Sequence, residues 1–173
     1  MDVTALLGKL LERVPFVEEY RAVRSGRRDH DRTKFTELDS LLSEPQLDRY
    51  LEAAYQQSIH RKLFEPIDRY LDWARFTSNR FLTAPIQEAR EVFDKALNEL
   101  SAFLAVNIFS LRSGASTEFL YFRPDQNPDF GGAFSGPDRD WFDQRVLELN
   151  QRIDACDAAY KAFRLAVKKK VHV

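Results

Sequence analysis

The sequence is poor in residues that cross-link a chain or carry it through a membrane. Its single cysteine, Cys156, cannot form a disulfide within the chain and suits a reducing compartment. A run of about 18 apolar residues, which a membrane-spanning helix needs, is absent. The N-terminus also lacks the basic head and apolar stretch of a signal peptide. These absences predict a soluble cytoplasmic protein that does not bind a membrane.

An excess of one charge sign is missing too. Lys and Arg total 26 against 27 Asp and Glu, and this balance excludes a uniformly basic nucleic-acid-binding protein and a highly acidic solvating one. Apolar residues are plentiful at 44%, with 14 Phe, 6 Tyr and 2 Trp, which argues against intrinsic disorder. A length of 173 residues fits one domain, residues 1–173, with a sizeable core.

Motifs of known chemistry are lacking as well. The three histidines, His30, His60 and His172, lie far apart, and none belongs to a metal-ligand pattern. The sequence has no nucleophile elbow, no dinucleotide fingerprint and no phosphate-binding glycine loop. It therefore predicts no catalytic residue, no metal and no cofactor, and favours a protein that is not an enzyme. A site assembled from residues distant in sequence stays open.

The clearest positive signal is helical periodicity. Apolar residues follow the alternating four-and-three spacing of a packed helix seam near the C-terminus, at Phe142, Val146, Leu149, Ile153, Cys156, Tyr160, Phe163 and Val167. A second seam over residues 84–111 contains one polar member, Asn107, which either fixes helix register or lies at a frayed end. Helix starts are indicated where a hydroxyl precedes a proline by two residues, at Ser43, Thr83 and Ser135.

The remaining segments are also mostly helical. Residues 45–82 indicate one helix kinked at Pro66 or two stacked helices, and the continuing apolar face favours the kink. His60 would then lie in the middle of a helix. An apolar helix over residues 3–20, bent or restarted at Pro15, is followed by a polar linker at residues 25–32 and a short helix over 35–42.

Together these segments predict an all-α fold, an antiparallel bundle of four or five helices with coiled-coil-like packing. One long connection rich in aromatic residues and glycine, residues 113–137, interrupts the helices. A helix that ends near Asn107, a glycine-bearing connection and another long helix together resemble uncharacterised helical proteins of bacteria. This resemblance implies no residue role and no activity.

The long connection is a candidate protein-binding surface because connections of this length are often functional. Its aromatic residues are Phe119, Tyr121, Phe122, Phe130 and Phe134. The alternative is that these rings simply cap one end of the bundle. Residues 117–123 also suit a short extended piece that Pro124 would end.

Two basic segments are candidates for binding anions or nucleic acid. Their residues are Arg24, Arg27, Arg28, Arg32 and Lys34 in the linker, and Lys168, Lys169 and Lys170 in the tail. A solvated connection and the favourable effect of cations at a helix C-terminus are the simpler explanations. No aromatic residue alternates with the arginines, so the sequence gives no support for base stacking.

These features lead to two functional hypotheses. The first is a non-enzymatic helical protein that binds another protein chain or a second copy of itself through a helix face or the aromatic connection. The alternative is an accessory protein that binds the phosphate backbone of nucleic acid through its two basic segments.

Overall fold

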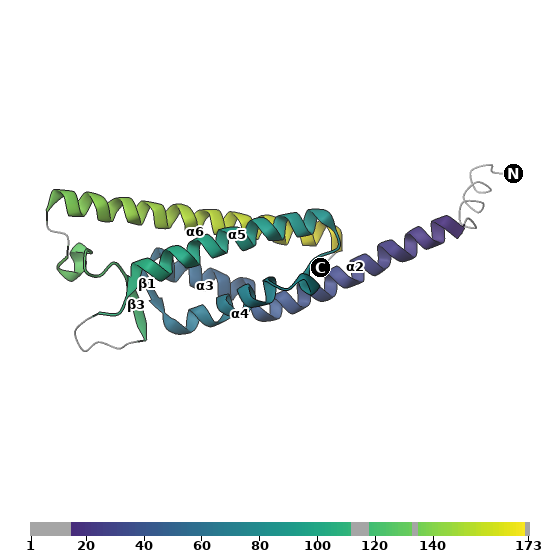
Figure 1. Ribbon diagram of the computed structural model, residues 1–173, viewed down its shortest axis with the longest axis horizontal. Helices are drawn as coiled ribbons and strands as arrows, with labels where there is room; N and C mark the ends of the chain where they lie inside the picture. The colour runs from purple at the N-terminus through teal and green to yellow at the C-terminus, as the bar shows by residue number, and fades with distance from the viewer. Residues whose placement is uncertain (1–14, 112–117, 133–134, 172–173) are drawn as a thin grey trace.

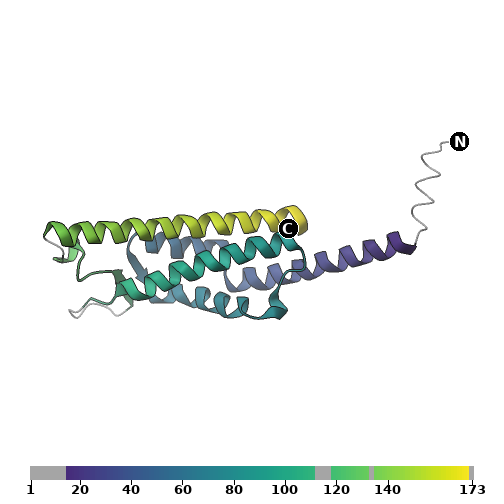
Figure 2. The ribbon, with the colours of Figure 1, turned by 45° about the horizontal axis from the view of Figure 1, so that its top comes forward.

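The computed structural model describes residues 15–111, 118–132 and 135–171. Within these ranges lie five α-helices: α2 (Pro15–Leu41), α3 (Glu44–Tyr55), α4 (Phe64–Ala74), α5 (Ala84–Asn107) and α6 (Gly136–Val171). Helices α5 and α6 run antiparallel along the length of the bundle (Figures 1 and 2). Helices α2 and α3 also run antiparallel to α6. Arg32 in α2 contacts Val171 at the end of α6, and Glu44 at the start of α3 pairs with Arg164, which lies earlier in α6. The predicted all-α antiparallel bundle is confirmed.

The core follows the predicted seam of α6. Seven of its eight positions are buried, and Val146 packs against the core while partly exposed. Phe93 of α5 lies at the centre, with its ring centroid 5.1 Å from that of Tyr160 and 5.4 Å from that of Tyr70. Each such ring contributes about 1.5–3 kcal/mol on burial. The aromatic residues that argued for a folded chain thus hold α4, α5 and α6 together.

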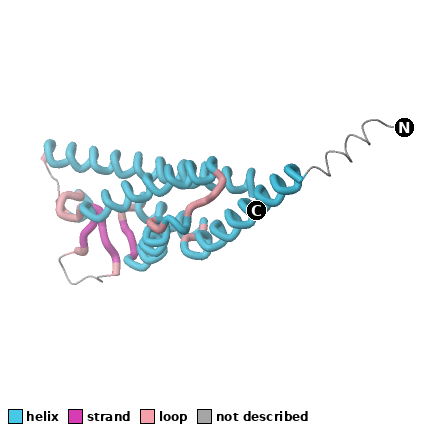
Figure 3. Tube along the Cα trace, turned by 45° about the vertical axis from the view of Figure 1, so that its right-hand side comes forward, coloured by secondary structure: helices cyan, strands magenta, loops and turns pink. Residues whose placement is uncertain are grey.

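A small antiparallel sheet closes one end of the bundle (Figure 3). Its strands are β1 (Ser58–His60), β2 (Ile108–Phe109) and β3 (Phe119–Phe122), in the order β1-β3-β2. β3 confirms the extended piece predicted near residue 120. β1 and β2 were not predicted, and their pairing brings Ile59 opposite Leu120. His60 therefore lies in a strand, and its predicted position within a helix is wrong.

The predicted kink at Pro66 is wrong, and the alternative of two helices is right. α3 ends at Tyr55, where Gln57 adopts a left-handed conformation with φ of 58°, and the chain then enters β1. Pro66 is the third residue of α4, where its missing N–H costs no helical hydrogen bond. The break therefore precedes the proline by several residues.

The predicted polar linker at residues 25–32 is also wrong, because α2 is continuous through it. Arginine favours helix, and Gly26 lies in open space, where even an added Cβ would have no neighbour within 4 Å. Every residue from 18 to 27 is exposed, and Figure 1 shows this part of α2 projecting beyond the bundle. We call residues 18–27 the arm. The part of the predicted N-terminal helix at residues 3–14 lies outside the described residues.

All three predicted helix starts are confirmed, since α3, α5 and α6 begin directly after Ser43, Thr83 and Ser135. The Ser43 N–H donates to the Gln46 side chain at 2.8 Å. The start of α5 is held differently, by the buried carboxylate of Asp31 in α2. It accepts hydrogen bonds from the backbone N–H groups of Leu82 at 2.6 Å and Thr83 at 3.1 Å.

The helix predicted over residues 84–111 ends earlier, at Asn107. The buried side chain of Asn107 donates to the carbonyl oxygen of Phe103 at 2.7 Å. That carbonyl lies one turn before the end of α5. Asn107 thus occupies the helix end rather than the middle of the seam, and β2 begins at the next residue.

Candidate functional site

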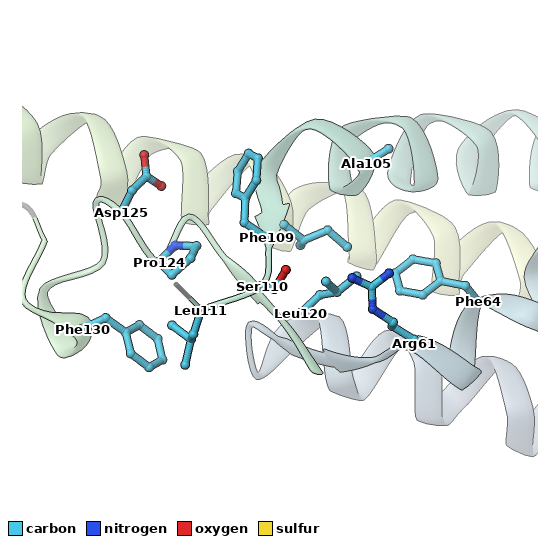
Figure 4. A pocket seen from close by; sticks show the side chains of 11 residues that line it. Arg61, Phe64, Ala105, Phe109, Ser110, Leu111, Leu120, Pro124, Asp125 and Phe130 are labelled. Carbon is cyan, nitrogen blue, oxygen red and sulfur yellow. The ribbon is translucent and has the colours of Figure 1, made fainter. Parts of the chain in front are cut away.

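An open groove of about 990 Å³ lies beside the sheet, where α4, α5 and the connection after β3 meet (Figure 4). Its lining is mainly apolar: Phe64, Ala105, Ile108, Phe109, Leu111, Leu120, Pro124 and Phe130. Arg61, Ser110 and Asp125 add polar groups. Figure 4 shows Leu111 and Phe130 close together at one end of the groove, with Arg61 and Phe64 at the other. The groove therefore combines segments that are distant in sequence.

The aromatic connection divides between the surface and the core. Phe119 and Phe130 are 39% and 44% exposed, and Phe130 also lines the groove. Tyr121 is half-buried with its ring edge-on to Phe130, 5.2 Å between centroids. Phe122 is fully buried, with its ring beside those of Phe103 and Phe142. The expectation that Phe122 belongs to a partner-binding surface is therefore wrong. Phe134 lies outside the described residues.

Two residues that the sequence analysis did not single out belong to the groove. Phe109 and Leu111 were predicted to lie in the last turns of a helix over residues 84–111. In the structure both lie beyond α5, Phe109 in β2 and Leu111 two residues after that strand. Phe109 is 42% exposed. A sequence signal existed, because Ile108 and Phe109 are β-formers that follow an asparagine. The helical spacing of the apolar residues before Asn107 instead favoured a helix that continues to Leu111.

The backbone around the groove is fixed by tight local geometry. Arg123, which follows β3, has φ of 43°, and its N–H donates to the Asn107 carbonyl at 2.7 Å. Its guanidinium lies 5.0 Å from the Trp141 ring centre and 5.5 Å from that of Phe109. A Cβ at Gly132 would lie only 2.6 Å from a backbone atom of Gln126, so glycine is required there. The turn carrying Pro124 and Phe130 is thus anchored to α5 and α6.

The two basic segments lie together at the opposite end of the bundle from the groove (Figure 1). The Arg32 guanidinium donates to the Val171 carbonyl at 3.1 Å, which places the last turn of α6 against α2 at the base of the arm. Lys168, Lys169 and Lys170 of this turn are exposed. The sequence presented these segments as separate, and only the tertiary structure brings them together.

Other basic side chains near this end are already neutralised. Lys34 contacts the carboxylate of Glu37 at 2.8 Å and the Asn79 side chain at 3.2 Å, so it does not belong to an open anion surface. Arg164 pairs with Asp39 and Glu44 and lies over the Phe35 ring. Among the described residues, no ion pair engages Arg24, Arg27, Arg28 or the three lysines of the last turn.

A buried polar cluster joins α4 to α5. The Arg90 guanidinium lies 3.2 Å from the Asp94 carboxylate and donates to the Asn79 carbonyl at 2.8 Å. The Tyr70 hydroxyl donates to the same carboxylate, and desolvation by burial raises the pKa of Asp94. The ion pair and these hydrogen bonds link the two helices, although the Arg90 Nε itself lacks a hydrogen-bond partner among the described residues. The cluster therefore braces the connection from α4 to α5.

Groups that could perform catalysis are dispersed in the described part of the chain. His30 contacts the Arg80 carbonyl at 3.0 Å at one end of the bundle, while His60 lies in the sheet at the other. Burial raises the pKa of the Cys156 thiol to about 12, which leaves it protonated and unreactive. The described ranges contain no cluster of three or more His, Cys, Asp and Glu side chains able to hold a metal ion.

Comparisons with known proteins give no further guidance. No protein-family model matches the chain, and neither a curated protein nor a solved structure is significantly similar to it. Of the helices in the described ranges, none has both the length and the apolar character needed to cross a membrane.

Proposed function

We propose that the protein is a non-enzymatic helical interaction protein that binds another protein chain, a second copy of itself included, through the groove beside the sheet. The observation that carries this proposal is the exposure of two aromatic rings at the groove, Phe109 at 42% and Phe130 at 44%. Exposed aromatic side chains that cluster around a concave apolar surface are typical of protein-binding sites.

The energetics favour an apolar side chain of a partner as the occupant. Full burial of a phenylalanine contributes about 1.5–3 kcal/mol, so covering the exposed two-fifths of each ring contributes about 1 kcal/mol. The rings are already held in place, Phe130 against Tyr121 and Phe109 beside Arg123. Little side-chain entropy is then lost when a partner binds.

The proposal is tested with a groove variant and a matched control. The groove variant combines Phe109→Ser with Phe130→Ser, and the control combines Val92→Ser with Leu147→Ser, which are 60% and 58% exposed outside the groove. Light scattering after size exclusion measures self-association, and panning of a random peptide library measures binding to other chains. We expect self-association or peptide binding in the native protein and the control, and its loss in the groove variant.

Two results contradict the proposal. One is a strict monomer at the highest concentration reached, together with a library that yields no peptide whose binding depends on Phe109 and Phe130. The other is an equal loss of binding in the groove variant and the control, which would show that any exposed apolar side chain suffices. Far-UV circular dichroism of both variants checks that they remain folded.

A further inference from the structure

We propose that the arm and the last turn of α6 form one surface that binds the phosphate backbone of double-stranded nucleic acid. The surface, called the basic end, consists of Arg24, Arg27, Arg28, Arg32, Lys168, Lys169 and Lys170. It lies at the opposite end of the molecule from the groove (Figures 1 and 2), so this proposal does not depend on protein binding there.

Charge is strongly segregated in the chain despite its near-neutral total. Residues 21–34 carry six basic and two acidic side chains, and residues 158–173 carry five basic side chains and no acid. These two segments therefore hold a net charge of +9, which leaves −10 on the rest of a chain whose total is −1. The arm also carries Glu18 and Glu19, so the positive charge is concentrated from Arg21 onward, and such a concentration attracts a polyanion even when the whole protein is slightly acidic.

The fold converts two segments of sequence into one surface. Arg32 and Val171 are 139 residues apart in sequence, and a hydrogen bond of 3.1 Å joins them. The three lysines precede Val171 directly and are all exposed. Cations at a helix C-terminus stabilise the helix, but that effect does not require a second basic helix alongside.

The charges of the basic end are available to a ligand. Arg24, Arg27 and the three lysines are exposed, Arg28 is partly exposed, and no ion pair within the described ranges neutralises any of them. Lys34 and Arg164 lie close by and are both paired with carboxylates. Within this region the structure thus distinguishes cations that stabilise the fold from cations that face solvent.

The geometry of α2 at the basic end fits a duplex. Arg24 in the arm and Arg28 and Arg32 directly after it are four residues apart, which spaces them by about 6 Å along one side of the helix. A single projecting α-helix has the width that the major groove of B-DNA admits, and arginines along it reach phosphates on the groove walls. No aromatic side chain stands between these arginines to stack on unpaired bases, which favours a duplex over a single strand.

Other polyanions fit the surface less well. Binding at a membrane surface requires an amphipathic helix with a continuous apolar face, whereas the side of α2 that carries Arg24, Arg28 and Arg32 is charged. An acidic protein surface would offer fewer closely spaced charges than a duplex, which carries one charge per about 1.7 Å of its axis. Both enter the test as competing outcomes.

The test is fluorescence anisotropy of a labelled DNA duplex of about 24 base pairs, titrated with the full chain as the salt concentration rises from about 50 to about 200 mM. If five of the seven side chains neutralise phosphates, the logarithm of the affinity falls with the logarithm of salt with a slope of about −4.5. The affinity then decreases about 500-fold over this range. Polyglutamate and anionic phospholipid vesicles are tested as competitors.

Three variants locate the contacts. The variant Arg24→Ala, Arg27→Ala, Arg28→Ala removes three phosphate contacts, so we expect the slope to become shallower by about 2.7. The variant Lys168→Ala, Lys169→Ala, Lys170→Ala should have a similar effect, because both helices contribute to one surface. The variant Arg24→Lys, Arg27→Lys, Arg28→Lys retains the charge and should restore the slope.

A matched control removes the same charge elsewhere. Arg49→Ala, Arg69→Ala, Arg139→Ala changes exposed positions on α3, α4 and the start of α6, and we expect it to leave the slope unchanged. An unchanged slope in both alanine variants of the basic end overturns the proposal. So does an absence of duplex binding at low salt, or stronger binding to polyglutamate or to vesicles than to the duplex. Loss of the groove aromatics should not affect duplex binding.

Discussion

Asp31 should contribute more to the free energy of unfolding than any other charged side chain of α2, although Asp29, two residues before it, is chemically the same. Its carboxylate is fully buried and accepts the backbone N–H groups of Leu82 and Thr83 at the start of α5. Replacing Asp31 with alanine leaves both donors without a partner and removes a negative charge from a helix N-terminus. The substitution thus acts on the junction between α2 and α5.

The magnitude follows from these two bonds. A hydrogen bond to a charged group contributes about 1.5–3 kcal/mol, and loss of a capping side chain costs about 1 kcal/mol. Asp31 is buried, but Leu82 is exposed and Thr83 is partly exposed, so water recovers some of the loss at the two amides. We therefore expect Asp31→Ala to lower the free energy of unfolding by about 3 kcal/mol. Asp31→Asn, which keeps one acceptor oxygen, should cost about half as much.

Urea denaturation followed by circular dichroism measures this change. With a slope of about 2 kcal/mol per molar urea, a loss of 3 kcal/mol lowers the midpoint by about 1.5 M. Asp29→Ala is the matched control, because Asp29 is exposed and its side chain accepts a long hydrogen bond of 3.5 Å from Ser25, while its bond with Thr33 uses the backbone carbonyl that alanine keeps. It should change the stability by less than about 0.5 kcal/mol. Hydrogen exchange at Leu82 and Thr83 should accelerate in Asp31→Ala and stay slow in the control.

If Asp31→Ala and Asp29→Ala have the same midpoint within error, the buried carboxylate does not hold the start of α5. Faster exchange throughout the chain, without an additional effect at the two amides, would show a general loss of stability instead of a lost cap.

Two further predictions concern the core. Phe93→Ala should leave a cavity among the rings of Tyr70, Tyr160 and Phe163. We expect urea denaturation to show a free energy of unfolding lower by about 3–5 kcal/mol. A loss under about 1 kcal/mol would mean that the three rings do not pack on Phe93. Cys156 is buried, and burial raises the pKa of its thiol to about 12. Dithiobis(nitrobenzoate) at pH 8 should therefore label the thiol only as fast as the protein opens. Labelling at the rate of a free thiol would contradict its burial.

Several features of the fold could be predicted because they depend on local chemistry. The seam of α6 repeats with the period of a packed helix, so its buried side was readable without knowledge of its neighbours. The three helix starts depend on a hydroxyl and a proline two residues apart, and all three lie where they were expected. β3 was readable from the run of aromatic residues before Pro124.

Other features depend on partners far away in sequence and could not be read from local patterns. The segment 56–63 leaves the helix because β1 pairs with β3, whose residues follow some sixty positions later. The polar residues 25–32 resemble a linker, but α2 continues through them, because His30, Asp31 and Arg32 bind backbone groups of the bundle. The groove was also missed, since its lining comes from α4, α5, the sheet and the turn after β3.

The sequence alone therefore determined that most of the chain is helical, which side of α5 and α6 packs inward, and that the chain carries two basic segments and a cluster of aromatic residues. Side-chain spacing and local backbone preferences suffice for that. Only the tertiary structure decided that Phe122 lies in the core while Phe109 and Phe130 remain exposed, and that Arg32 meets the end of α6. The physical reason is that burial and charge proximity are properties of the packed chain, set by contacts between residues that the sequence does not place together.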